Sequence, residues 1–192
     1  MTDKELIDGC LRGKRSAQDE LYRRYAGKLF AVCLRFTRNR MDAEDLLQEG
    51  FVKIFKKIDT VRRDQEAALY PWMRRVFVNL TLNYLRDEKK YRFTEDISGM
   101  EYQLSDEKEE SSAPLFEHVS PLEITKIISN LPDGYRTVFN LYAFEGYSHQ
   151  DIADALGISV NTSKTQLMKA RRQIALALEK KIKNKPQLKL VI

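Results

Sequence analysis

Apolar residues recur every three or four positions along most of this chain, the spacing that places them on one face of a helix. In the N-terminal part, this pattern predicts helices over residues 2–13, 16–36, 42–58 and 71–91. No hairpin dipeptide such as Asn-Gly separates alternating apolar runs, so the sequence gives strands no support. The pattern therefore predicts an all-α protein.

Residues suited to helix starts stand where these helices are expected to begin. The capping pairs of the first three helices are Thr2 with Glu5, Ser16 with Asp19, and Asp42 with Asp45. Pro71 suits the first turn of the fourth helix, where a backbone N–H is not needed. On that fourth helix, we expect Trp72 and Tyr84 to pack in the core rather than to serve as exposed stacking surfaces.

Two further short helices are predicted over residues 122–131 and 133–144. Ile127 and Ile128 belong to the apolar face of the first, and Pro132 ends it. We expect Asp133 to cap the second of these helices.

Residues 146–172 predict a helix, a tight turn and a second helix. Ser148 with Asp151 can cap the first helix, and Ser159 can cap the second. Gly157 stands at the turn, a position that favours a residue tolerant of positive φ. Together these features predict a helix-turn-helix.

The second helix of this motif is apolar on one side and polar and basic on the other, a form that fits the major groove of DNA. The predicted DNA-contacting residues are Asn161, Thr162, Lys164, Thr165, Gln166, Lys169, Arg171 and Arg172. The alternative is a helical hairpin with a solvated charged face. The short turn, the glycine and the order of the caps favour the DNA-binding interpretation.

Charge is strongly segregated along the chain, although the net value is only +5. Residues 1–92 hold 21 Lys and Arg against 14 Asp and Glu, and residues 121–192 hold 11 against six. Between them, residues 93–120 hold one Lys against eight Asp and Glu. We therefore predict two small helical domains, 1–92 and 121–184, joined by a flexible acidic linker over 93–120 and followed by a tail, 185–192. The two basic domains suit a polyanion as partner.

Several classes of protein find no support in the sequence. No apolar run approaches the ~20 residues that cross a bilayer, and the N-terminus lacks the apolar core of a signal peptide. There is no phosphate-binding loop, and His118 and His149 have no cysteine or paired carboxylate at metal-ligand spacing. Cys10 and Cys33 are predicted to be buried thiols. We expect a cytoplasmic protein without membrane insertion, catalytic site, metal or cofactor.

Three motifs, in this order, resemble those of a known family. The first is DAEDLLQEGFVKIF (residues 42–55), the second is PWMRRVFVNLTLNYLR (71–86), and the third is GYSHQDIADALGIS (146–159). They are similar to the polymerase-binding helix, the promoter-melting helix and the −35 reader of bacterial RNA polymerase sigma factors of the extracytoplasmic-function (ECF) group. The resemblance covers nearly the whole chain except the linker and the tail. It implies a sigma factor that binds core RNA polymerase, reads −35 duplex DNA and traps melted −10 DNA.

The resemblance also implies particular contact residues. Those expected to bind the clamp helices of the largest polymerase subunit are Asp42, Glu44, Asp45, Gln48 and Glu49. Early carboxylates on a helix can alternatively serve only to complement the helix dipole, at ~0.3–1 kcal/mol each. Those expected to contact −10 DNA are Arg62, Arg63, Asp64, Gln65, Arg75, Asn79, Asn83 and Arg86. The implied partners are core RNA polymerase and promoter DNA, with an anti-sigma factor as a further possibility and a monomer as the free form.

Four residues depart from the family pattern. Asn83 stands where Asp is common, Phe77 where Ala is common, Ser163 where an apolar residue is usual, and Gln166 where Arg is frequent. Because Gln pairs with adenine whereas Arg favours guanine, no promoter consensus is transferred to this chain.

Two other function classes stay open at this point. A transcription regulator with a ligand-sensing or dimerising N-terminal domain would bind a palindromic site as a free dimer. The basic, aromatic-rich helix after Trp72 and the lack of a long dimerisation helix argue against it. An all-helical enzyme or scaffold with an incidental helix-turn-helix is opposed by the absence of any cluster of catalytic residue types.

Overall fold

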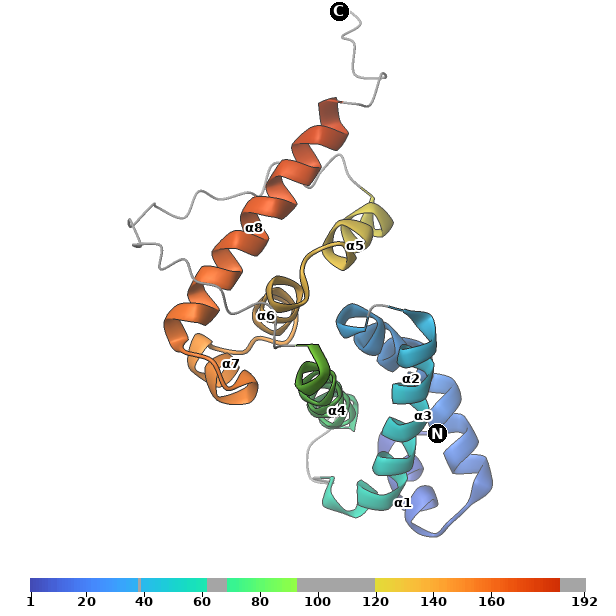
Figure 1. The fold of residues 1–192 in the computed structure, drawn as a ribbon. Coiled ribbons are helices and arrows are strands. Elements are labelled where there is room, and N and C mark those ends of the chain that lie inside the picture. The colour runs from blue at the N-terminus through green and yellow to red at the C-terminus, as the bar shows by residue number, and fades with distance from the viewer. Residues whose placement is uncertain (38, 62–68, 93–119, 184–192) are drawn as a thin grey trace, which may run out of the picture. The chain divides into compact units, whose positions relative to one another are not determined.

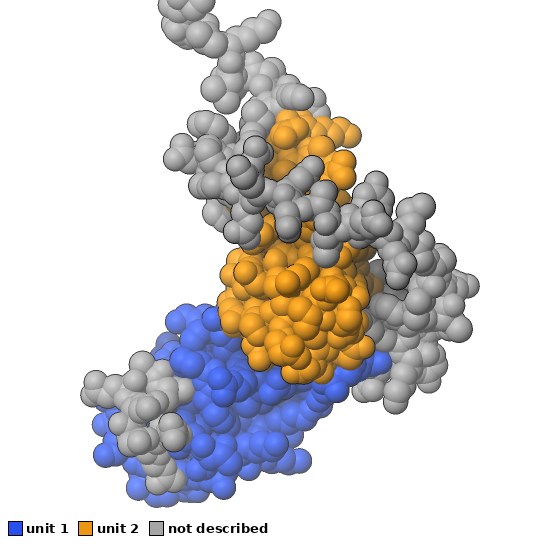
Figure 2. Space-filling view, turned by 90° about the vertical axis from the view of Figure 1, so that its left-hand side faces the viewer, with its two compact units in different colours: residues 1–91 blue, residues 92–192 orange. Residues whose placement is uncertain are grey.

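The computed structural model describes residues 1–37, 39–61, 69–92 and 120–183 (Figure 1). Within these ranges, the regular elements are helices, which confirms the prediction of an all-α fold. The chain divides into two compact units, Met1–Tyr91 and Arg92–Ile192 (Figure 2). Apart from Ser120, the predicted linker lies outside the described residues, as does the predicted tail.

Four α-helices and one short 3-10 helix form the N-terminal unit: α1 (Asp3–Leu11), α2 (Arg15–Phe36), α3 (Arg40–Lys57), η1 (Ile58–Thr60) and α4 (Leu69–Arg92). Their apolar faces meet in one core. Its largest fully buried side chains include Leu6, Leu21, Leu29, Phe36, Ile54, Met73 and Phe77. Cys10 and Cys33 are free and buried in this unit, as predicted.

The start of α1 follows the predicted capping box, in which Thr2 Oγ1 accepts from the backbone N–H of Glu5 and Glu5 accepts from that of Thr2. The predicted start of α2 is wrong. That helix begins at Arg15 with Lys14 at the N-cap and no side-chain cap. The carbonyl of Lys14 already accepts from the N–H groups of residues 17 and 18, so Ser16 lies inside the first turn.

The predicted cap of α3 is also wrong by one turn. Asn39, not Asp42, is the N-cap, and its side-chain oxygen accepts from the N–H of Asp42 at 2.8 Å. Asn is as good an N-cap as Asp, and it stands three residues earlier. Asp42 is therefore a first-turn residue whose carboxylate is available to α4.

A close approach of α3 and α4 fixes the position of α4. Gly50 of α3 faces the ring of Phe77, which is fully buried, and a Cβ at Gly50 would lie 2.8 Å from Phe77 Cε2 and nearer still to Cζ. One turn from the start of α3, the hydroxyl of Tyr84 donates to Asp42 Oδ2 at 2.7 Å. These two contacts hold the inner side of α4 and leave its outer side to solvent.

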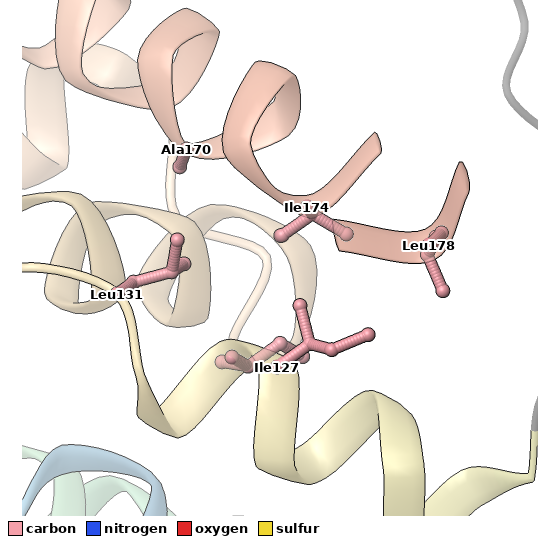
Figure 3. Close-up of a cluster of buried hydrophobic side chains, with 6 residues drawn as sticks. Ile127, Leu131, Ala170, Ile174 and Leu178 are labelled. Carbon is pink, nitrogen blue, oxygen red and sulfur yellow. The ribbon is translucent and has the colours of Figure 1, made fainter. Parts of the chain in front are cut away.

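Four helices form the C-terminal unit: α5 (Pro121–Ser129), α6 (Asp133–Ala143), α7 (His149–Leu156) and α8 (Val160–Lys183). The apolar residues that the spacing predicted meet in one cluster, in which α5 packs against α8 (Figure 3). Its buried members are Ile127, Ile128, Leu131, Ala170, Ile174 and Leu178.

One predicted cap in this unit is wrong. Pro132 is the N-cap of α6, and Asp133 is its first residue. Instead of capping, Asp133 accepts a hydrogen bond from the buried Arg136 guanidinium at 2.7 Å, and Arg136 also donates to the carbonyl of Ser129. The hydrogen bond from Arg136 to Ser129 joins α6 to the end of α5, and the charge-assisted bond to Asp133 holds the guanidinium in place. None of the helices described here is long and apolar enough to cross a bilayer.

Candidate nucleic-acid and partner interfaces

The turn between α7 and α8 is built by the residues that the sequence singled out. Ser148 Oγ accepts from the N–H of Asp151, and the Asp151 carboxylate accepts from Ser148 in return, so hydrogen bonds from Ser148 lower the pKa of Asp151. Gly157 ends α7 in the left-handed region, at φ 67°. Ser159 Oγ then accepts from the N–H of Thr162 at 3.0 Å, in the first turn of α8. The predicted caps of the helix-turn-helix are confirmed.

The outer side of α8 carries most of the predicted DNA-contacting residues. The exposed ones are Asn161, Thr162, Lys164, Arg171 and Arg172, whereas Thr165, Gln166 and Lys169 are half-buried. Met168 stands among them and is 48% exposed. Sequence reasoning missed this residue because an apolar side chain on a helix is ordinarily assigned to the core.

Gln166 is directed toward α6. Its side-chain amide lies 3.2 Å from the position that a Cβ on Gly134 would take. A larger residue than glycine at the start of α6 would displace this amide. Arg171 also has a neighbour on α6, because its guanidinium lies 5.7 Å from the centroid of the Tyr142 ring.

The outer side of α4 presents four of the predicted residues in one stripe. Arg75, Asn79, Asn83 and Arg86 are all exposed and follow one another at intervals of three or four residues. Trp72, at the start of the same stripe, is half-buried, as is Tyr84 on the inner side. The other predicted candidates, residues 62–65, lie outside the described part of the chain.

The predicted polymerase-binding residues on α3 are in different situations. Asp42 accepts from Tyr84 and from the Asn39 side-chain amide, so its carboxylate is used within the unit. Glu44 pairs with Arg40 at 2.6 Å, and Glu49 pairs with Lys53 at 2.6 Å. Asp45 and Gln48 are exposed.

Two exposed apolar residues extend this face of α3. Met41 is 69% exposed and Val52 is 51% exposed, and with Asp45 and Gln48 they form a stripe at helical spacing. A groove of 380 Å³ lies beside the stripe, between α2 and α3. It is lined by Tyr22, Ala26, Gly27, Phe30, Arg40, Glu44, Leu47 and Gln48. This mixture of apolar and acidic groups suits a protein partner with apolar and basic side chains.

Comparison with known proteins identifies what these faces belong to. A model of sigma-70 region 2 matches residues 21–91, and a model of sigma-70 region 4 matches residues 122–174. The ECF RNA polymerase sigma-E factor of Haemophilus influenzae is 30% identical over 181 residues, which are 91% of this chain and 94% of that protein. The chain belongs to the ECF sigma factors. It therefore directs promoter-specific initiation of transcription by RNA polymerase.

Two further proteins are similar to this sigma factor over most of its length. The RNA polymerase sigma-H factor of Pseudomonas aeruginosa is 28% identical over 92% of this chain and 94% of its own length. Among solved structures, CnrH in complex with the cytosolic domain of CnrY is 22% identical, with a TM-score of 0.47, and covers 93% of this chain and 97% of its own.

The two family matches cover the faces described above. The region 2 match spans α3 and α4, and the region 4 match spans the first half of α8 with all eight predicted DNA-contacting residues. RNA polymerase and promoter DNA are thus the partners of this sigma factor.

Proposed function

We propose that this sigma factor divides its work among three helix faces. The outer side of α8 reads −35 duplex DNA, the outer side of α4 holds the melted −10 strand, and the outer side of α3 binds core RNA polymerase. The protein makes and breaks no covalent bond. It acts by placing polymerase and by retaining melted DNA through binding energy.

The observation that carries this proposal is the composition of the three faces. Each helix buries an apolar side in the core of its own unit and exposes a polar side of a different kind. The face of α8 combines cations with small polar residues and Met168. The face of α4 combines two cations with two amides. The face of α3 combines carboxylates with apolar residues.

Each composition suits its proposed ligand. Lys and Arg on α8 can reach phosphates and guanine edges in a duplex, and an apolar group such as Met168 can contact a thymine methyl. On α4, Arg75 and Arg86 supply charge for the backbone of a single strand, while Asn79 and Asn83 supply hydrogen bonds for exposed base edges.

The proposed polymerase face has carboxylates that a basic partner can recruit. The Glu44–Arg40 and Glu49–Lys53 pairs are exposed i,i+4 pairs, worth only ~0.3–0.5 kcal/mol each. A partner cation can replace the internal one at little cost. Asp45 and Gln48 are already exposed between the apolar ends of the stripe.

The division between the two DNA-binding faces can be tested by fluorescence anisotropy. The probes are a duplex that the polymerase-bound wild-type protein selects from a randomised pool and a single strand that carries its −10 segment. Lys164→Ala and Arg172→Ala should weaken duplex binding and spare single-strand binding, whereas Asn79→Ala and Arg86→Ala should do the reverse. A lost bidentate base contact would reduce affinity by about 5- to 150-fold.

Lys180→Ala serves as the matched control, since it removes one exposed cation from the same helix outside the region 4 match. It should change duplex affinity by much less than Lys164→Ala. If both groups of variants lose both probes equally, the proposed division is wrong. Tight, sequence-specific duplex binding by the free protein as a dimer would favour the transcription-regulator alternative.

The polymerase face can be tested by size-exclusion co-elution with core enzyme. The double variant Asp45→Lys/Gln48→Lys places two cations on the stripe and should abolish co-elution while the helical circular dichroism stays unchanged. Asp19→Lys, a charge reversal at an exposed position on α2, is the control and should still co-elute. Unchanged co-elution of the double variant would contradict the assignment of α3.

The remaining parts of the proposal rest on the family resemblance and on the sequence. They are a monomeric free form, an anti-sigma factor as regulatory partner, location in the cytoplasm, and the absence of a cofactor. Within the described ranges, no group of three or more His, Cys, Asp or Glu side chains is placed to hold a metal ion.

A further inference from the structure

Ser163 is a fully buried polar residue in the first turns of α8. Its neighbours in sequence, Thr162 and Lys164, are exposed on the proposed DNA-reading face. The Ser163 hydroxyl lies 2.9 Å from Nδ1 of His149, the first residue of α7. A polar group at this buried position needs such a partner, because a buried hydroxyl without one is strongly unfavourable.

The imidazole of His149 is held in turn by α6. Its ring stacks on that of Tyr142, with 4.9 Å between the centroids and 27° between the planes. The Arg171 guanidinium lies 5.7 Å from the centroid of the same Tyr142 ring. Ser163, His149, Tyr142 and Arg171 thus connect α8 to α7, α7 to α6, and α6 back to α8.

We propose that His149 is a positioning residue for −35 recognition, which it serves by fixing the rotation of α8 through its hydrogen bond to Ser163. This inference rests on the proposed reading of duplex DNA by α8. Apolar contacts are satisfied over a range of helix rotations. A buried hydrogen bond is satisfied only where donor and acceptor meet, so it selects one rotation.

The charge state of His149 suits this role. Burial, with Lys164 and Arg171 of α8 nearby, lowers the pKa of the imidazole. The ring is therefore neutral at pH 7, and it adds no third positive charge beside the two cations. A neutral imidazole can pair with a hydroxyl through Nδ1 in either tautomer.

Substitutions at position 149 can separate the hydrogen bond from the ring stack. His149→Asn keeps a polar atom near the place of Nδ1, whereas His149→Gln extends its amide toward the place of Nε2. His149→Phe keeps the aromatic stack on Tyr142 and removes the hydrogen bond. The double variant His149→Phe/Ser163→Val replaces both polar partners with apolar groups, which avoids leaving a buried hydroxyl unpaired.

The measurement is the ratio of affinities for the selected −35 duplex and for a shuffled duplex of equal length and composition. We expect His149→Gln and His149→Phe to reduce this ratio about tenfold, with non-specific binding to the shuffled duplex unchanged. His149→Asn should keep the ratio within about twofold of wild type. The double variant should be more stable to unfolding than His149→Phe. Its affinity ratio should stay below the wild-type ratio, because apolar contacts do not fix the rotation of α8.

The controls distinguish a failure of the positioning role of His149 from a failure of the proposed reading of duplex DNA by α8. Thermal melts by circular dichroism establish that each variant is folded at the assay temperature, and binding to the −10 single strand should be the same for all of them. If Lys164→Ala also leaves duplex binding intact, the proposed function of α8 is at fault. If Lys164→Ala weakens duplex binding while His149→Phe keeps the wild-type ratio, or if His149→Asn fails to restore it, the positioning role is overturned.

Discussion

Adding one methyl group at Gly50 would destabilise the N-terminal unit, because the ring of Phe77 occupies the space that the methyl needs. A Cβ at this position would lie 2.8 Å from Phe77 Cε2 and closer to Cζ and Cε1. Either the Phe77 ring or the backbone of α3 must therefore shift, and the ring has little room to do so. Phe77 is fully buried, and the Phe51 ring meets it edge to face with 5.9 Å between the centroids.

Two opposing effects set the size of the change. Gly→Ala inside a helix is ordinarily favourable by ~1 kcal/mol, because the unfolded chain loses conformational freedom. Forcing an extra carbon into a packed core is unfavourable by ~1–3 kcal/mol, or more where the neighbours cannot relax. Because ring edge and backbone meet head-on here, we take the upper part of that range. The expected net loss for Gly50→Ala is about 1–2 kcal/mol of unfolding free energy.

Trp72 gives a local probe for this measurement. It is the only tryptophan of the chain and lies on α4, so its fluorescence during urea unfolding reports on the unit that contains Gly50. Gly27→Ala is the matched control. Gly27 lies inside α2 with no atom within 4 Å of a Cβ at its position, so this variant should gain up to ~1 kcal/mol.

A double variant tests the cause. Phe77→Leu shortens the side chain that meets the new methyl, so Gly50→Ala/Phe77→Leu should be more stable than the sum of the single changes predicts, by about 1 kcal/mol. If Gly50→Ala stabilises the protein as much as Gly27→Ala does, the close approach of α3 and α4 does not constrain this position. Strict additivity of the two changes would also contradict the reasoning.

Two further predictions concern ionisable groups. Hydrogen bonds from Ser120 and Lys181 lower the pKa of Glu123 to about 2, so the stability that its carboxylate contributes is complete above a pH of about 4.5 and is lost as the pH falls toward 2. Glu123→Gln should flatten the pH dependence of thermal stability in that interval. An unchanged profile would contradict the assignment. Burial raises the pKa of Cys33 to about 12 and also raises the pKa of Cys10. Neither thiol should therefore react with an aromatic disulfide reagent at pH 8 until urea unfolds the protein. Rapid reaction of the folded chain would refute their burial.

Sequence reasoning succeeded where the determining interactions are local. The capping boxes of α1 and α7, the left-handed Gly157 and the cap of α8 all depend on residues three or four positions apart. The apolar spacing likewise predicted the sides of α5 and α8 that pack against each other in Figure 3. The cap predictions were wrong at α2, α3 and α6, where a residue one to three positions earlier than the predicted one is the N-cap. The position of the N-cap depended on backbone geometry that spacing does not contain.

The site could be predicted only in outline, because the direction of a polar side chain depends on which helix packs beside it. Gln166 lies against Gly134, which is 32 positions earlier, and Asp42 accepts from Tyr84, which is 42 positions later. Met168 is exposed because no described helix covers that side of α8. Helical periodicity places a residue on a side of its own helix but does not place the neighbouring helix.

Two of the residues that we expect to depart from the family pattern have a specific partner in the structure. Phe77 stands where Ala is common, and it packs against a glycine of α3. Ser163 stands where an apolar residue is usual, and it is bonded to His149. In each case the residue contacts a second residue that lies on another helix.

The same reasoning applies to promoter preference. Gln166 replaces a common Arg, but its amide lies against α6 rather than at the centre of the outer side of α8. We therefore infer that Lys164 and Met168, both exposed on that side, contribute more to base preference than Gln166 does. A lysine favours guanine and a methionine favours the thymine methyl, so a duplex selected by the wild-type protein should lose its preference at different base pairs in Lys164→Ala and in Met168→Ala. Loss of preference in Gln166→Ala alone would show that Gln166 leaves Gly134 when DNA binds.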